Sequence, residues 1–133
     1  MLLIKTKIGP SAVHGIGLFA DQFIPKGTVT WQYVPNVDIG ITKQEIESLP
    51  QLSKEYFLYY SYYDKKRDLH ILPVDHLKFI NHSAKEDLIN IDSTPDQDIA
   101  RRDIQIGEEL LCNYNNFDDL YFDRIHLASE DIK

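Results

Sequence analysis

The chain has 133 residues, of which 43% are hydrophobic and 26% charged, and this composition is typical of one globular domain with a core. It excludes collagen-like, coiled-coil and disordered proteins, and no apolar run approaches the roughly 18 residues that a membrane span needs. The net charge of −7 opposes tight binding to a nucleic-acid backbone and favours a basic partner such as a lysine-rich tail. An acidic surface that merely keeps the protein soluble is the simpler alternative.

Two further features bear on where the protein works. Cys112 is the single cysteine, which excludes an internal disulfide and a multi-cysteine zinc cluster. The first residues, MLLIKTK, are too short and too soon charged for a signal peptide. We therefore expect a cytoplasmic enzyme or binding domain that contacts neither a membrane nor nucleic acid directly.

Short strands are predicted at both ends of the chain, with helices between them. Segment 2–8 alternates loosely, and in segment 28–34 the side chains of Val29, Trp31 and Tyr33 share one face, as in a half-buried strand. Further strands are predicted at 88–91, 98–104 and 108–114. Strands at both ends with helices inserted between them indicate a β-rich α+β fold rather than a series of βαβ units.

The middle and the end of the chain are predicted to be helical. Thr42 and Glu45 have the spacing of a capping box, so a short helix is expected over 42–49. Ser53 is the expected N-cap of a second helix that carries several tyrosines. Segment 117–127 is the expected closing helix.

The first segment that could carry chemistry is His14-Gly15-Ile16-Gly17. Two glycines one residue apart let the backbone approach a ligand closely and expose its amide and carbonyl groups. The segment lacks the third glycine of a dinucleotide fingerprint and opens no obvious helix, so we reject a Rossmann nucleotide site. A tight turn between strands is the structural alternative.

The second segment is Asn81-His82-Ser83, which directly follows an apolar stretch. Small polar side chains in such a place indicate a buried polar turn, in which each group must find a hydrogen-bond partner. Asn81 and His82 are candidates to present side-chain and backbone groups to a ligand. A structural Asx turn with a satisfied histidine is the alternative.

The third segment, GEELLCNY, runs from Gly107 to Tyr114. Leu110, Cys112 and Tyr114 share one face of the strand that is expected here. A tyrosine at the end of an apolar face can project its hydroxyl into a pocket, although most tyrosines in such places simply pack.

In this order and spacing, the three segments resemble the SET-domain family, which consists mainly of protein-lysine N-methyltransferases that use S-adenosylmethionine. The resemblance covers residues 3–122 and looks closest to small stand-alone bacterial and viral SET proteins. It implies a single SET domain over 1–133, built of small antiparallel sheets with a knot-like C-terminal crossing. It also implies a short helical insert at about 35–75 and a C-terminal lid at about 115–133.

The resemblance implies a role for each motif. In the family, the Gly-x-Gly segment lies against the methionine part of the cofactor, which places residues 14–17 there. The Asn-His motif of the family holds the amino group and the adenine of the cofactor, and it falls on Asn81 and His82. The invariant tyrosine maps onto Tyr114, which would contact both the cofactor methyl and the incoming lysine as the catalytic residue.

The implied reaction is an in-line displacement by a neutral lysine amine, so alignment supplies much of the rate. An aromatic, water-poor channel beside a cationic sulfonium lowers the pKa of the lysine that must lose its proton first. Tyr60 and Tyr62 are the expected channel residues, and the other tyrosines of 56–63 are expected mainly to pack. Phe117 is expected to pack on the adenine or to close the channel, with Tyr121 and Phe122 behind it.

Departures from the family pattern leave other hypotheses open. The family usually continues Asn-His-Ser with Cys-x-Pro-Asn, whereas this chain has AKED at 84–87. A second hypothesis is therefore a SET-like module that binds a basic peptide without catalysis. A third is a metalloenzyme that uses His70, His76, His82 and Asp75, but histidines six residues apart do not share a helix face. We expect no metal, because the cysteine-rich zinc flanks of many members are also absent.

The expected partner is a lysine-bearing protein substrate that is itself basic, in keeping with the acidic balance of this chain. Some small SET proteins pair up to complete their sites, so a homodimer is also compatible with the resemblance.

Overall fold

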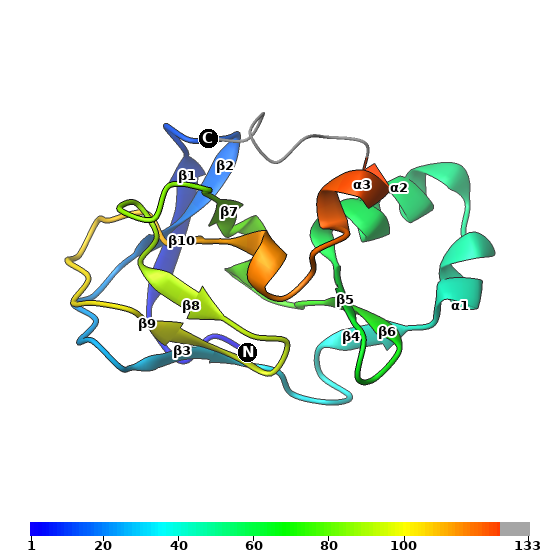
Figure 1. The fold of residues 1–133 in the computed structure, drawn as a ribbon, viewed down its shortest axis with the longest axis horizontal. Coiled ribbons are helices and arrows are strands. Elements are labelled where there is room, and N and C mark those ends of the chain that lie inside the picture. Colours follow the sequence, from blue (N-terminus) through cyan, green and yellow to red (C-terminus); the bar gives the residue numbers. More distant parts are fainter. Residues whose placement is uncertain (126–133) are drawn as a thin grey trace.

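The computed structural model describes residues 1–125, and Figure 1 shows them as small sheets joined by short helices. Three of the four sheets in this part of the chain are antiparallel, which agrees with the predicted β-rich α+β class. Strands from both ends of the chain gather on one side of the molecule, and the middle segment forms the other side (Figure 1). Among the described helices, none is long and apolar enough to cross a membrane.

The N-terminal hairpin consists of β1 (Thr6–Pro10) and β2 (Ile16–Ala20), which pair antiparallel with Gly9 opposite Gly17. The strand begins later than the predicted segment 2–8. Leu2 instead forms an isolated bridge with Trp31, because the chain bends between the two pairings.

A second sheet has the strand order β3 (Val29–Gln32), β9 (Gln97–Ala100) and β8 (Ile91–Ser93). The register of β3 on β9 shifts between Val29 and Trp31. This irregularity interrupts the predicted alternation, so that Thr30 and Trp31 are both buried. Trp31 and Ser93 each lie directly opposite Asp98, one on each side of β9.

The middle segment forms a sheet with the order β4 (Ile39–Ile41), β6 (Leu69–Leu72) and β5 (Tyr62–Asp64). Two helices cross between its strands, α1 (Lys43–Glu47) and α2 (Gln51–Tyr60). The predicted capping box is confirmed, because Thr42 and Glu45 exchange hydrogen bonds of 3.1 Å in both directions.

The N-cap predicted for the second helix is wrong. Pro50 occupies this position, and Ser53 lies one turn inside α2. Proline suits a helix start because its fixed φ matches the helix and the first backbone N–H groups have no helical partner there.

The two motif-bearing segments meet in the parallel pair β7 (Asn81–His82) and β10 (Leu111–Cys112). The 3-10 turn η1 (His76–Phe79) precedes β7, and η2 (Tyr114–Asn116) follows β10, so the predicted strand 108–114 is shorter than expected. The closing helix α3 (Tyr121–Ile125) starts four residues later than predicted. Residues 126–133 of the predicted helix and lid lie outside the described part.

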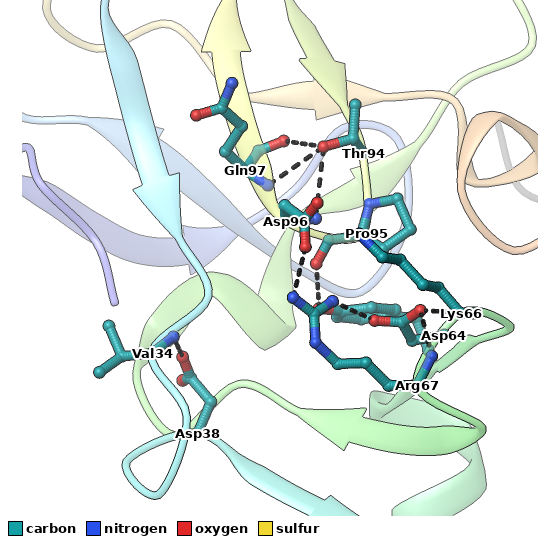
Figure 2. A network of polar contacts seen from close by, with 10 residues as sticks. Val34, Asp38, Asp64, Lys66, Arg67, Thr94, Pro95, Asp96 and Gln97 are labelled. Atoms are coloured by element: carbon teal, nitrogen blue, oxygen red, sulfur yellow. Dashed lines mark hydrogen bonds and ion pairs between the residues drawn. The ribbon is translucent and has the colours of Figure 1, made fainter.

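A polar network joins the middle segment to the β8–β9 turn (Figure 2). The Arg67 guanidinium contacts the carboxylates of Asp64 at 2.5 Å and Asp96 at 2.7 Å. Close by, the Tyr62 hydroxyl donates to the Pro95 carbonyl at 2.7 Å. The Arg67–Asp96 and Tyr62–Pro95 contacts hold the middle segment against the sheet of β3, β8 and β9.

Candidate active site

The loop that leads from β1 to β2 carries the Gly-x-Gly segment. The Ser11 N–H donates to the Gly15 carbonyl at 2.8 Å, and Gly15 has a φ of +48°, which favours glycine. A Cβ on Gly17 would lie 2.9 Å from the carboxylate of Glu109, so the second glycine permits a close approach. The loop is therefore shaped by a positive φ at one glycine and by a crowded contact at the other.

Asn81 holds this loop in place. Its side-chain amide donates to the carbonyls of His14 at 2.8 Å and Ile16 at 3.2 Å, and also to Glu109 Oε2 at 3.1 Å. Glu109 in turn accepts from the Ser11 hydroxyl at 2.7 Å. One asparagine thus ties the first motif to the third, and Ser11 and Glu109 complete the arrangement, although no motif reasoning had singled them out.

His82 is completely buried and acts on Tyr114. Its Nδ1 accepts the backbone N–H of Tyr114 at 3.1 Å, and its ring packs 4.9 Å from that of Phe122. Burial lowers the pKa of His82, which keeps the ring neutral and able to accept this hydrogen bond. The side chain of His82 therefore positions the tyrosine.

Tyr114 lies at the centre of an aromatic cluster. Its hydroxyl donates to the Ile80 carbonyl, and its ring packs against those of Phe117, Tyr121 and Phe122. Burial raises the pKa of Tyr114 well above its usual value, so the hydroxyl stays protonated.

Two adjoining cavities meet at Tyr114. The first, here called the loop cavity, has an empty volume of about 730 Å³ and is lined by His14, Gly15, Ile16, Tyr59, Tyr60, Lys78, Phe79, Ile80, Asn81, Tyr114 and Tyr121. The second, here called the aromatic cavity, has an empty volume of about 540 Å³, and its lining includes Trp31, Tyr59, Tyr60, Tyr62, Lys78, Ile80, Asp98, Cys112, Tyr114, Phe117 and Tyr121. Six residues line both: Tyr59, Tyr60, Lys78, Ile80, Tyr114 and Tyr121.

The structure divides the predicted site residues between these cavities. Of the cofactor candidates, the loop residues 14–16, Asn81 and Tyr114 line the loop cavity, whereas Gly17 and His82 do not. The channel candidates Tyr60, Tyr62 and Phe117 all line the aromatic cavity. Phe117 lines the aromatic cavity and is absent from the lining of the loop cavity.

Tyr59 is a site residue that sequence reasoning did not select from among the tyrosines. Its hydroxyl lies 2.9 Å from His14 Nε2, and its carbonyl accepts the Tyr121 hydroxyl at 2.6 Å. It thus joins the Gly-x-Gly loop, α2 and α3 at the place where the cavities meet. The tyrosine-rich helix was the available signal, but only the helix phase decides which ring faces the cavities.

The histidines of the metalloenzyme hypothesis do not converge. His70 is buried against Tyr63, His76 is exposed, and His82 contacts Tyr114. Burial lowers the pKa of His70 to about 4. Within residues 1–125 no group of three His, Cys, Asp or Glu side chains could hold a metal ion.

A family model of the SET domain matches residues 15–115, which include both glycines of the first motif and the whole of the second and third. The chain therefore belongs to the SET-domain family. No curated protein matches it.

Solved structures show the same fold. A polycomb repressive complex 2 chain of Chaetomium thermophilum is 23% identical with a TM-score of 0.62, over 86% of this chain and 15% of that one. A ctPRC2 chain bound to S-adenosylmethionine is 22% identical with a TM-score of 0.64, over 92% of this chain and 17% of that one. A Plasmodium falciparum chain described as a histone methyltransferase is 21% identical with a TM-score of 0.57, over 85% of this chain and 95% of that one.

The chain thus spans about one sixth of the polycomb chains that it matches and nearly the full length of the Plasmodium chain. The likeness confirms the predicted SET fold of small sheets.

Proposed function

We propose that this protein transfers a methyl group from S-adenosylmethionine to the ε-amine of a protein lysine. The observation that carries the proposal is the place of Tyr114, which lines both the loop cavity and the aromatic cavity. A methyl donor on one side and a lysine on the other would meet at this tyrosine. Membership of the SET family supports this arrangement.

The loop cavity fits the cofactor. A Cβ on Gly15 would meet nothing within 4 Å, so the backbone there is open to a ligand. The backbone of residues 14–16 and the region of Asn81 would hold the methionine part, with the hydrogen bonds of Asn81 fixing the loop in advance. When bound, S-adenosylmethionine supplies an electrophilic methyl group on a sulfonium.

The aromatic cavity suits the lysine. At pH 7, deprotonating a lysine of ordinary pKa costs roughly 4–5 kcal/mol. The rings of Tyr60, Tyr62 and Phe117 provide apolar surroundings that disfavour the charged ammonium and thereby lower this cost. Tyr114 stays neutral and is oriented by its bond to the Ile80 carbonyl, so it does not compete as an anion for the methyl group.

The direct test is transfer of labelled methyl from S-adenosylmethionine to a pool of basic proteins, followed by amino-acid analysis. We expect methyl-lysine with the wild-type protein and at least a hundredfold loss with Tyr114→Phe, while calorimetry shows cofactor binding within threefold of wild type. Tyr56→Phe is the matched control, because this tyrosine is exposed on α2 and lines neither cavity. Failure of the wild type to bind the cofactor would refute the proposal.

The same experiment addresses the catalytically inactive alternative. That alternative predicts a folded protein that binds a basic peptide but never methylates it. The departure at 84–87 does not disturb the motif before it, since the Lys85 N–H donates to the Ser83 hydroxyl at 3.0 Å and closes a local turn. The structure thus offers no observation that favours the inactive module.

A basic protein substrate, a homodimer and a cytoplasmic location complete the proposal. The net charge of −7 supports the first.

A further inference from the structure

The aromatic cavity is bounded on one side by polar side chains. Trp31, Asp98 and Ser93 lie opposite one another on β3, β9 and β8, so their side chains share one face of this sheet. All three line the cavity, although they are only 1%, 4% and 8% exposed. We call these three residues the polar floor.

Within the described part of the chain, the polar floor contains two buried groups without a hydrogen-bond partner and a carboxylate without an ion pair. Trp31 Nε1 and Ser93 Oγ form no hydrogen bond with any residue of 1–125. Asp98 takes part in none of the ion pairs formed within the same residues. Buried polar groups are normally paired, and a buried carboxylate without a cation is costly. The Ser93 hydroxyl and the Asp98 carboxylate can both accept hydrogen bonds from a ligand, whereas the Trp31 indole N–H can only donate and contributes its ring face to the cavity.

The chemistry of the floor selects a cation. A carboxylate beside a hydroxyl can accept two of the three N–H groups of an alkylammonium, and the surrounding tyrosine and phenylalanine rings favour a cation as well. An anion would be repelled by Asp98, and a neutral apolar group would leave the carboxylate unpaired. Lys78 also lines the cavity but forms no ion pair with Asp98 among the described residues.

We propose that the polar floor binds the ε-ammonium group of the substrate lysine, with the Asp98 carboxylate as its counter-ion and the acceptor of its proton. This inference rests on the proposed function and assigns to Asp98 a role that none of the three motifs contains.

The proton transfer balances within the pair. One N–H bond of the ammonium breaks and one O–H bond forms on Asp98, which gives a neutral amine and a neutral carboxylic acid. The nitrogen lone pair that is left then forms the bond to the methyl carbon, while the carbon–sulfur electron pair stays on sulfur. The proton on Asp98 leaves to solvent with product release. Burial raises the pKa of Asp98 to about 7, against the opposing effects of the neighbouring Ser93 hydroxyl and the N-terminal ammonium, and this value suits such an acceptor.

Trp31 is the only tryptophan of the chain, so its fluorescence reports on this cavity alone. The probe is n-butylammonium, which reproduces the end of a lysine side chain, with 1-butanol as the neutral comparison. We expect the Trp31 fluorescence of the wild type to change saturably as n-butylammonium is added at pH 8. The Asp98→Asn variant should bind n-butylammonium at least tenfold more weakly than the wild type. Asp92→Asn should bind like wild type, because this carboxylate lies exposed on the neighbouring strand.

A second measurement needs no variant. Binding of n-butylammonium to the wild type should weaken more than tenfold between pH 8 and pH 5.5, as Asp98 takes up a proton. The other titratable groups lining the cavity include Cys112, Tyr62 and Tyr114, and burial raises the pKa of each, so all three stay neutral over this range. Two cations lie near Asp98: the Lys78 ammonium lines the cavity, and the N-terminal ammonium lowers the pKa of Asp98. An absent or pH-independent signal, or equal binding by Asp98→Asn, would overturn the inference.

The outcomes separate the two proposals. If the wild type methylates lysine and the kcat/KM of Asp98→Asn stays within twofold of it across pH 6–9, the floor has no role and only the methyltransferase stands. If n-butylammonium binds in an Asp98-dependent way but the wild type never transfers methyl, the ammonium site stands and the methyltransferase does not.

Discussion

The fold strongly changes the pKa of one residue, Asp98. Its carboxyl lies on a central strand beside Trp31 and Cys112, and burial raises its pKa to about 7. Because the folded state binds this proton more tightly than the unfolded chain, the stability of the protein falls as the pH rises from about 4 to about 7. The cost of burying the charge is fully present above the folded pKa.

This gives a prediction on stability. Between pH 5 and pH 8, the Asp98 carboxyl should lower the free energy of unfolding by about 2–3 kcal/mol, and Asp98→Asn should remove this part of the pH dependence. Urea denaturation of both proteins at the two pH values measures the difference. Parallel pH profiles for the two proteins would show that Asp98 is not buried as a titrating carboxyl.

Gly9 and Gly17 lie opposite each other in the N-terminal hairpin, so an alanine substitution at one is a matched control for the same substitution at the other. An alanine at Gly17 would push against the Glu109 carboxylate at 2.9 Å and the Ser11 Cβ at 3.0 Å, whereas an alanine at Gly9 would meet only the Phe19 ring at 3.9 Å. We expect Gly17→Ala to weaken binding of S-adenosylmethionine at least tenfold and Gly9→Ala to leave it within twofold. Isothermal calorimetry measures the affinity of both variants for S-adenosylmethionine. Equal affinities of the two variants would refute the importance of the close contact between Gly17 and Glu109.

At the scale of the element, helix α1 is short, and its start depends on one residue. Thr42 accepts from the Glu45 N–H, and Ile46 anchors the helix in a cluster with Phe57 and Leu72. Thr42→Ala should therefore destabilise the protein by about 1 kcal/mol. Thermal unfolding measures this, with Thr42→Ser as the control that keeps the hydroxyl. If Thr42→Ser lost as much stability as Thr42→Ala, the result would contradict the capping explanation.

At the scale of the whole molecule, Arg67 holds the middle segment to the sheet of β3, β8 and β9 (Figure 2). The side chain of its partner Asp64 is only 1% exposed, and the guanidinium also lies 4.7 Å above the Tyr33 ring. Removing Arg67 would leave a buried carboxylate without its cation. The Arg67 side chain is itself 31% exposed, which reduces the loss through solvent screening.

Arg67→Ala should accordingly destabilise the protein by roughly 2 kcal/mol and speed hydrogen exchange in β5 and β6. Lys65→Ala is the matched control from the same turn, because its ion pair with Asp119 is exposed on both sides. It should cost less than about 0.5 kcal/mol. If both variants have the same stability, the network does not join the two parts of the molecule.

The sequence by itself determined the features that depend on short-range patterns. The capping box at Thr42, the β-rich class and the order of the three motifs follow from neighbouring residues, because local backbone preferences act within a few positions. Residue types at motif positions also pointed to Asn81 and Tyr114, both of which line the loop cavity.

Tertiary structure alone decided what depends on contacts between distant segments. Strand 108–114 shortens because Tyr114 turns to meet His82 and Ile80, and the phase of α2 selects Tyr59 to face the cavities. Glu109 lies in the third motif without a role assigned to it there, and Asp98 lies outside all three motifs. Only the pairing of strands that are far apart along the chain places Glu109 against the Gly-x-Gly loop and Asp98 in the aromatic cavity. Long-range contacts of this kind leave no period or spacing in a single sequence from which they could be read.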